Sequence, residues 1–426
     1  MTTVPLSVLD LVPVSSGSTP AAALRNTVDL AVAAERAGYA RYWLAEHHLN
    51  PGVAGSAPNI VIGAVAGATS RIRVGSAATL VGNVRGLQIA ETFGTLTGLY
   101  GPRFDLGLGR SGAPAPGTPR PPSLAPRADE VVDGLLVPAP YDFKVAPGSR
   151  FALQGELLGR VPGDVDRFEG ELDLIRALFA GTYTPGAASR ARSDAGSGSG
   201  TGTGTGPDAS SGFGPGPGPG SGSGPGSGFG VVEATPATGA AVELWIHGST
   251  GGASARAAGA LGLPYGANYH TSPGTVLASV QAYRDAFRPG VLPEPHVIVS
   301  ADVVVGRDTA EADELALGYG QWVSSIRSGV GAIPYPSPDE ARATELHGEA
   351  AAAVADRIAT RFVGDAAHVA DRLETLRRVT GADELLVTTI THDHAARVRS
   401  YELLAAEWAA RASGTAAEPV ATEAVR

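Results

Sequence analysis

One segment places three ionisable side chains, Glu46, His47 and His48, directly after a short apolar stretch. The ordinary pKa of histidine is about 6.5, so its imidazole can give or take a proton near neutral pH. If the stretch is a barrel strand, these residues stand at its carboxyl end, where barrel enzymes gather their catalytic groups. A histidine pair after a strand is also compatible with a cap or a packing contact, and this segment alone does not decide between the two.

A second segment ends an apolar run in Gly107, Gly109 and Arg110. The glycines allow a ligand to approach the backbone closely. The arginine presents several donors in a planar fork that suits a phosphate. A surface salt bridge is the alternative, because the G-x-G spacing lacks the full dinucleotide fingerprint and its following helix.

A third segment runs from an apolar stretch through Gly248, Ser249 and Thr250, and two further glycines, into an Ala-rich helix. Backbone N–H groups at the start of a helix attract anions, and phosphate sites of this kind recur in barrels of alternating strands and helices. Together with Arg110 this turn could hold a phosphate. An ordinary Gly/Ser turn is the alternative.

Near the C-terminus an apolar run gives way to Thr391, His392, Asp393 and His394. Two histidines around an aspartate suggest metal ligation. Histidines two apart on a capping turn point in different directions, however, and Thr391 or Asp393 suits a helix N-cap. We therefore expect a helix start here and no metal site.

These segments need a scaffold that brings their ends together. Short runs rich in β-branched residues alternate with helical patterns such as the one from Pro20 to Gly38, which has Thr19 as its candidate N-cap. The short runs are almost continuously apolar, as in parallel strands covered by helices. The alternation predicts an α/β fold, a closed (β/α)8 TIM barrel with insertions. The predicted strands are residues 6–14, 41–45, 72–79, 104–109, 243–247, 264–268, 297–304 and 384–389.

Residues 1–412 are predicted to form this single barrel, interrupted by two insertions. The Pro-rich insertion at 111–160 is expected to cross the barrel mouth. The insertion at 186–240 consists of Gly, Ser, Thr and Pro repeats with too few apolar side chains to offset the entropy of ordering, so we predict a disordered linker. The tail at 413–426 is also expected to be disordered.

Composition excludes several classes of function. The chain has 426 residues, a formal net charge of -10 and no cysteine. Without thiols, redox chemistry needs an organic cofactor or a metal held by histidines and carboxylates. No run of Lys and Arg is long enough to bind nucleic acid. The N-terminus lacks a basic stretch and no apolar run reaches the ~18 residues of a membrane span, so we expect a cytoplasmic protein without nucleic-acid or membrane partners.

Four stretches, in this order, resemble the bacterial luciferase-like monooxygenase family. They are WLAEHHL, RIRVGSAATLVGNVRGLQIAETFGTLTGLYGPRFDLGLGR, ELWIHGSTGGASARAAGALGLP and GADELLVTTITHDHAARVRSYELLA. The resemblance implies a barrel that binds reduced FMN, or in some branches a reduced deazaflavin, at the carboxyl ends of its strands. It implies that His47 and Glu46 are the catalytic residues. The residues that it implies for cofactor binding are Arg110, Gly248, Ser249, Thr250 and Ala77.

The chain departs from the family at four places. Gly86 stands where relatives usually have proline, Gly101-Pro102-Arg103 inverts a usual Pro-Gly-Arg, and His247 replaces a common aliphatic residue. Each of these changes could reshape the pocket. Gly109 replaces a reactive cysteine of the luciferase alpha subunit, so light emission is not implied.

The resulting expectation is an FMN-dependent monooxygenase that uses O2 to oxidise a small organic substrate. A separate flavin reductase would supply reduced FMN, because no nicotinamide-binding segment is visible. Two alternatives stay open: a deazaflavin-dependent oxidoreductase that transfers hydride, and a non-catalytic flavin-binding barrel. Relatives commonly dimerise, so a homodimer is a further expectation, and the sequence does not identify the substrate.

Overall fold

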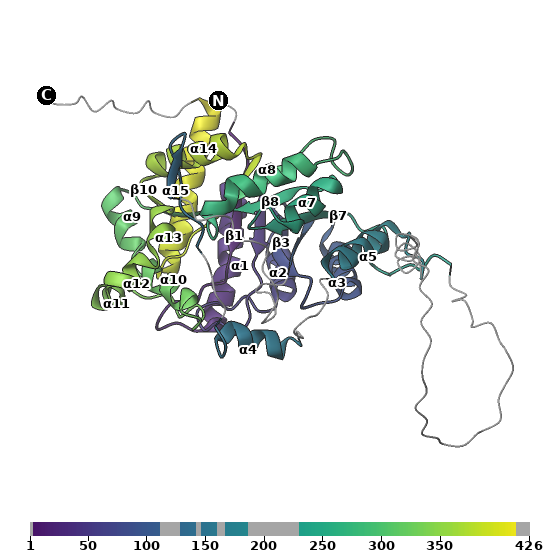
Figure 1. The fold of residues 1–426 in the computed structure, drawn as a ribbon, viewed down its shortest axis with the longest axis horizontal. Helices are drawn as coiled ribbons and strands as arrows, with labels where there is room; N and C mark the ends of the chain where they lie inside the picture. The colour runs from purple at the N-terminus through teal and green to yellow at the C-terminus, as the bar shows by residue number, and fades with distance from the viewer. Residues whose placement is uncertain (1–2, 111–127, 142–145, 160–166, 186–229, 415–426) are drawn as a thin grey trace, which may run out of the picture.

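Eight runs of mostly buried residues form the parallel strands of a closed barrel, with helices on its outside (Figure 1). The computed structural model describes residues 3–110, 128–141, 146–159, 167–185 and 230–414. The barrel strands are β1 (Leu6–Asp10), β2 (Arg41–Leu44), β3 (Arg73–Leu80), β4 (Phe104–Gly109), β7 (Val242–Gly248), β8 (Tyr265–Asn268), β9 (Val297–Val305) and β11 (Glu384–Thr388). Each strand pairs with the next in this order, and β11 pairs with β1, so the predicted (β/α)8 fold is confirmed.

A helix follows each barrel strand and covers the outside of the sheet. At the start of the first helix, the Thr19 side chain accepts a hydrogen bond from the N–H of Ala22, and Gly38 ends the helix with a φ of 89°. That left-handed backbone conformation favours glycine, as predicted. The covering helices are α1 (Pro20–Ala37), α2 (Pro58–Ala68), α3 (Gly86–Tyr100), α5 (Phe168–Ala180), α7 (Ala253–Ala260), α8 (Val276–Ala286, after the 3-10 turn η1 at Pro273–Thr275), α14 (Ala366–Thr380) and α15 (His394–Ser413).

The predicted strands match the observed ones to within one residue at each end, except at the end of the first. The predicted strand 6–14 ends at Asp10, because the chain turns out of the sheet there. Val12 has a φ of 56°, and its N–H donates to Asp10 Oδ1 over 2.7 Å. The residues after Asp10 are apolar because Val12 and Val14 are buried, not because they continue the strand.

The two faces of the strands pack into different cores. Outward-facing side chains such as Val8 and Tyr42 join the large core beneath the helices. Inward-facing side chains such as Leu9, Trp43 and Trp245 fill the barrel itself. The rings of Trp43 and Trp245 meet edge to face, with centroids 5.0 Å apart. The interior of the barrel is therefore packed with side chains. The space for a ligand is expected at the carboxyl ends of the strands.

Charged side chains close the amino-terminal end of the barrel. Arg41 contacts Asp105 (2.8 Å), Glu243 (2.7 Å) and Glu384 (3.0 Å), and Arg73 contacts the second oxygen of Asp105 (2.5 Å). Asp105 is fully buried and also accepts from the Trp43 indole. We call these five charged residues the barrel floor.

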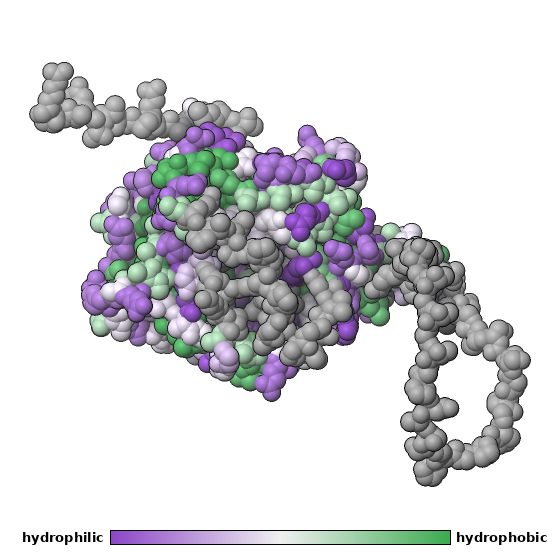
Figure 2. Space-filling view, in the orientation of Figure 1, coloured by the Kyte–Doolittle hydropathy of each residue, from purple (hydrophilic) through white to green (hydrophobic). Residues whose placement is uncertain are grey.

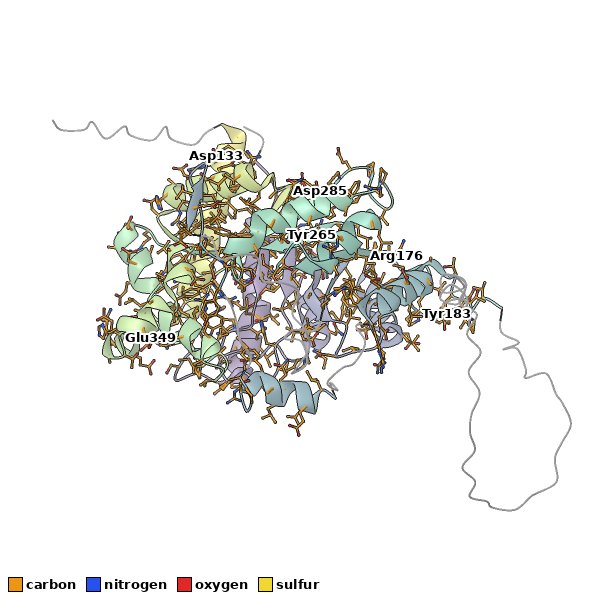
Figure 3. The ribbon with its side chains drawn as sticks, viewed as in Figure 1. Asp133, Arg176, Tyr183, Tyr265, Asp285 and Glu349 are labelled. Atoms are coloured by element: carbon orange, nitrogen blue, oxygen red, sulfur yellow. The ribbon has the colours of Figure 1, made fainter. Side chains whose placement is uncertain are left out.

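Two described parts of the first insertion contact the barrel. A hairpin of β5 (Glu130–Val132) and β6 (Leu135–Val137) packs against α14, where the Asp133 carbonyl accepts from Arg378 (Figure 3). Helix α4 (Arg150–Leu157) lies near the mouth, since Arg150 donates to the Leu49 carbonyl over 2.9 Å. The other residues of this insertion, 111–127, 142–145 and 160, lie outside the described residues.

A third insertion, which the sequence analysis did not predict, follows β9. It spans residues 306–361 and is built from short helices before β10 (Phe362–Gly364) extends the sheet beside the end of β9 (Figure 1). Its Tyr335 bridges to Ser15 in the loop after β1. The helices are α9 (Thr309–Leu315), α10 (Tyr319–Arg327), α11 (Pro338–Ala343), α12 (Gly348–Ala352) and α13 (Ala355–Ala359).

The range predicted to be disordered, 186–240, extends too far at its C-terminal end. Residues 230–240 form turns in which Ala234 and Ala237 are buried against Ala90 and Leu178. Small alanines pack there even though the segment is poor in large apolar side chains. The remainder of that insertion, 186–229, and the tail from 415 lie outside the described residues.

Figure 2 shows hydrophilic and hydrophobic residues interspersed over the visible described part of one face. Among the described residues, no helix is both long enough and apolar enough to cross a membrane.

Candidate active site

Glu46 and His48 bind each other at the end of β2. Glu46 Oε1 lies 2.8 Å from His48 Nε2 and accepts from Asn83 over 2.7 Å. Glu46 Oε2 accepts from the backbone N–H of Leu80 over 2.9 Å. Both oxygens of this buried carboxylate are therefore occupied, and they tie the end of β2 to the end of β3.

His47 faces elsewhere and is held by its backbone, whose N–H donates to the Gly55 carbonyl over 3.0 Å. Its Nδ1 is buried and has no hydrogen-bond partner among the described residues. Burial lowers the pKa of His47 to about 4, despite an opposite effect of the Glu46 charge. The imidazole is therefore neutral at pH 7 and can accept a proton or a hydrogen bond.

The end of β3 lies between this histidine and β4. Ala77 packs against the core inside the barrel, the peptide bond from Ala77 to Ala78 is cis, and the register with β4 shifts at this point. Gly109 sits beside it, and a Cβ at Gly109 would come 2.9 Å from the Cβ of Ala78. A cysteine at position 109 would therefore require the end of β3 to move.

Arg110 and Gly248 stand level with each other on neighbouring strands. Leu108 of β4 pairs with Ile246 of β7. Arg110 follows Leu108 by two residues, and Gly248 follows Ile246 by two residues. Paired strands lie about 4.8 Å apart. The Arg110 guanidinium also lies over the Phe168 ring at 5.2 Å from its centroid. The structure thus brings together the two segments that the sequence proposed for a phosphate.

The turn after Gly248 presents the start of α7. Its carbonyl groups are occupied, because Ser249 accepts from Thr275 over 2.5 Å and Thr250 accepts from Ser279 over 3.2 Å. The N–H groups in the first turn of a helix have no acceptor within the helix. Arg256, which the sequence analysis did not select, donates to the Gly251 carbonyl over 2.9 Å and adds a second guanidinium beside this turn.

His247 lies inside the barrel below the mouth. A Cβ on Gly107 would be 2.6 Å from its Nε2, and a Cβ on Gly266 would be 2.2 Å from its Nδ1, so the two glycines make room for the ring. Trp43 meets the ring edge to face, with centroids 5.3 Å apart. Burial lowers the pKa of His247 to about 4, so it is a neutral polar group beneath the mouth.

A further histidine, which was not among the residues predicted from the sequence, lies at the mouth. His270 follows β8 by two residues, and its Nδ1 lies 2.6 Å from Ser300 Oγ on β9. Burial lowers the pKa of His270 to about 4, and the charges of Asp302, Arg357 and His47 act on it more weakly. The signal was the one that marked His47, a histidine directly after a short apolar strand.

The family model of luciferase-like monooxygenases matches residues 4–133. The uncharacterized protein YvbT of Bacillus subtilis (strain 168) is 32% identical over 405 residues, which cover 95% of this chain and 96% of that protein. The chain belongs to the luciferase-like monooxygenase family. A luciferase-like monooxygenase of Escherichia coli (strain K12) is 29% identical, over 94% of this chain and 96% of its own. The crystal structure of apo-MsnO8 is 28% identical, with a TM-score of 0.68 over 95% of this chain and 98% of its own.

Two departures from the luciferase-like pattern lie away from the mouth interior. Gly86 begins α3 and donates its N–H to Glu171 of α5 over 2.7 Å, a bond that the usual proline cannot make. Arg103 precedes β4 at the opposite end of the barrel and donates to the Thr69 carbonyl over 2.7 Å. Both contacts lie outside the barrel, and an effect of these positions on the pocket stays a prediction.

The C-terminal histidines also serve the scaffold of this luciferase-like barrel. His392 Nε2 lies 3.0 Å from the Ser16 carbonyl, whereas His394 Nε2 lies 2.8 Å from Asp29. Asp393 between them caps α15 by accepting from the Ala396 N–H over 2.7 Å. The two histidines thus point to different partners, as the capping interpretation predicts.

Proposed function

We propose that the protein is a monooxygenase that binds reduced FMN at the carboxyl ends of β2, β3, β4 and β7 and uses O2 to oxidise a small organic substrate. The observation that carries the proposal is the placement of Arg110 level with the turn at Gly248, with His47 two strands away; His47 Nδ1 has no hydrogen-bond partner in the described part of the chain. A separate flavin reductase supplies the reduced FMN, and the protein acts as a homodimer.

The phosphate end of FMN fits the ends of β4 and β7. Arg110 offers a charged, planar set of donors, and the first turn of α7 offers backbone N–H groups and a helix dipole. Ser249 and Thr250 add hydroxyl groups next to these donors. Gly251 lies so close to the Ala278 carbonyl that a Cβ added at position 251 would be only 2.9 Å from its oxygen, which fixes the path of the turn.

Bound reduced FMN would supply the electrons that activate O2. His47, neutral and buried, would hold or accept a proton at Nδ1 beside the reacting ring. Ala77 and Gly109 keep the neighbouring strand ends small enough to admit a flat ring. Glu46 is a positioning residue in this scheme, because its oxygens hold His48 and the end of β3.

The names of structural neighbours support a flavin or deazaflavin. The oxygenating constituent of the 3,6-diketocamphane monooxygenase of Pseudomonas putida, solved with FMN, shares the fold at 16% identity, with a TM-score of 0.57 over 95% of this chain and 97% of its own. An F420-dependent secondary alcohol dehydrogenase, solved with an F420-acetone adduct, shares it at 15% identity, with a TM-score of 0.51 over 94% and 98%. We propose FMN as the cofactor, and the test must distinguish it from a deazaflavin.

The binding arm of the test compares FMN with riboflavin, which lacks the phosphate. Arg110→Ala should weaken FMN binding by about 1 to 3 kcal/mol, because a charge-assisted contact is lost, and should leave riboflavin binding unchanged. Arg342→Gln, on the exposed α11, is the matched control and should change neither affinity. Equal affinity of the wild type for FMN and riboflavin would contradict the phosphate role.

The reaction arm begins with anaerobic titration by reduced FMN and by a reduced deazaflavin, followed by admission of O2. The wild type should bind reduced FMN and change the rate of its reaction with O2 relative to free reduced FMN. His47→Ala should keep FMN binding and lose that effect, whereas His394→Ala should behave as the wild type. Binding of only the deazaflavin, with no O2 consumption, would replace the proposal with hydride transfer.

A further inference from the structure

A buried group of four polar side chains joins the third insertion to the end of β9. It consists of Asp302, Tyr319, Arg357 and Arg361, which we call the mouth cluster. Tyr319 donates to Asp302 Oδ2 over 2.5 Å, and Arg357 Nη2 lies 2.7 Å from the Tyr319 hydroxyl and 3.4 Å from Asp302 Oδ2. The Arg361 guanidinium lies on the face of the Tyr319 ring, 3.8 Å from its centroid. All four side chains are therefore in contact.

The cluster is buried but its polar atoms are not fully bonded. Asp302 is 3% exposed, Arg361 5% and Arg357 9%. Among the described residues, Asp302 Oδ1, Arg357 Nε, Arg361 Nε and Arg361 Nη2 have no hydrogen-bond partner. Arg361 uses one N–H group on the Ala316 carbonyl, at 3.1 Å. Buried polar atoms in folded proteins are almost always paired, so this concentration indicates a bound polar group.

The charges of the cluster show what kind of group it is. Two arginines face one carboxylate, and Arg361 forms no ion pair with any described residue. Asp356, beside Arg357, is occupied by Arg327 at 2.5 and 2.7 Å. Water can satisfy the N–H groups of a buried guanidinium, but it does not neutralise the charge, and an uncompensated buried charge is costly. An anion does both.

The cluster faces the proposed reaction site. Asp302 lies on β9 two residues after Ser300, which holds His270, and the charges of Asp302, Arg357 and His47 all act on His270. On the other side, Tyr319 and Arg361 line a cavity of about 500 Å³ between the insertion, β10 and α14. The carboxylates lining this cavity, Asp313 and Glu345, are exposed and form no ion pair with Arg361.

We infer that the mouth cluster binds the carboxylate of the substrate, so that the substrate class is small organic acids. Arg361 and Arg357 take the carboxylate, and Asp302 Oδ1 accepts a hydrogen bond from an N–H or O–H group on the same molecule. The assignment of the anion as the substrate rests on the proposed function. The anion-binding site itself is inferred from the mouth cluster alone.

The test uses acetate and its uncharged analogue acetamide on the full-length protein, at constant ionic strength. Acetate should raise the unfolding temperature saturably, because it binds only the folded state, and acetamide should not. Arg361→Gln should weaken the acetate effect at least tenfold, and Arg342→Gln should leave it unchanged. If Arg361→Gln fails to fold, the comparison of acetate with acetamide on the wild type decides alone.

Equal effects of acetate and acetamide, or an undiminished acetate effect in Arg361→Gln, would overturn the inference. FMN affinity measured on the same samples keeps the two proposals apart. Acetate should not compete with FMN; competition would mean that the cluster holds the flavin phosphate, and the substrate assignment would be lost. Failure of FMN to bind while acetate still does would reject the proposed function and keep the anion site.

Discussion

The barrel floor and the mouth cluster lie at opposite ends of the barrel, and they differ in how completely their charges are matched. At the barrel floor, Arg41 and Arg73 face three carboxylates, and each arginine lies within 3.3 Å of at least two of them. His296 also lies there, and a hydrogen bond to Glu384 raises the pKa of its imidazole above the ordinary value. At the mouth cluster, Arg361 forms no ion pair with a carboxylate of any described residue.

This contrast indicates a different role for each end of the barrel. Burial is similar, since Asp105 of the floor is 0% exposed and Asp302 of the mouth cluster 3%. A fully matched network can stabilise a fold, whereas an unmatched buried charge costs stability unless a ligand compensates it. In barrels of this type the amino-terminal end serves stability and the carboxyl end serves chemistry. We therefore read the floor as structural and the mouth cluster as a binding site.

The largest effect should come from removing an arginine at the floor. Arg41→Met should lower the free energy of unfolding by about 3 to 5 kcal/mol, because it leaves buried carboxylates without their main partner. Burial by itself would lower the pKa of Arg41, but Asp105, Glu384 and Glu243 raise it above the ordinary value, which shows how strongly the carboxylates hold this charge. Denaturant unfolding measures the change, with the exposed Arg342→Met as control. A loss below about 1 kcal/mol would remove the distinction between the two ends.

The second largest effect should be the pH dependence of stability, to which histidines at the two ends contribute with opposite sign. Burial lowers the folded-state pKa of His47, His247 and His270 to about 4. The unfolded chain binds these protons near pH 6.5, so stability falls as the pH drops below that value, by about 2 kcal/mol per histidine at pH 5. The raised pKa of His296 has the opposite sign: its contribution is present in acid and is lost as the pH rises through its folded pKa.

The measurement is denaturant unfolding at pH 7 and pH 5. His47→Ala should lose about 2 kcal/mol less stability between these pH values than the wild type. His296→Gln should lose more than the wild type, because the stabilising protonated form is gone. Identical pH dependence in all three proteins would mean that neither imidazole is perturbed as the structure indicates.

The barrel and the meeting of Arg110 with the turn at Gly248 could be predicted because their signals are local. Apolar strands, glycine stops and capping residues lie within a few positions of one another, so the sequence indicated Thr19 as one helix cap and either Thr391 or Asp393 as another, and the structure has Thr19 and Asp393. Arg110 and Gly248 are far apart in the sequence, but each follows a predicted strand. A parallel barrel brings such positions to one edge whatever their separation.

The mouth cluster could not be predicted in the same way. Its members come from β9, α10, α13 and the turn after α13, and Asp302 and Arg357 are 55 positions apart. Their partners are set by how a helical insertion folds back on the strand end, and no local pattern encodes that. His270 could have been found, because it follows a strand as His47 does. Glu46 could not have been assigned to positioning, since its bonds to Asn83 and Leu80 depend on the next strand.

The smallest expected effect gives the strictest comparison, because it uses the same substitution as the largest. Arg361→Met should change the free energy of unfolding of the ligand-free protein by no more than about 1 kcal/mol, or raise it. It removes a buried charge that has no ion-pair partner among the described residues, together with a hydrogen bond to the Ala316 carbonyl and contacts with Tyr319 and Tyr335. Denaturant unfolding beside Arg41→Met measures both in one experiment. If Arg361→Met were as destabilising as Arg41→Met, Arg361 would be a structural residue and the mouth cluster would need no ligand to explain it.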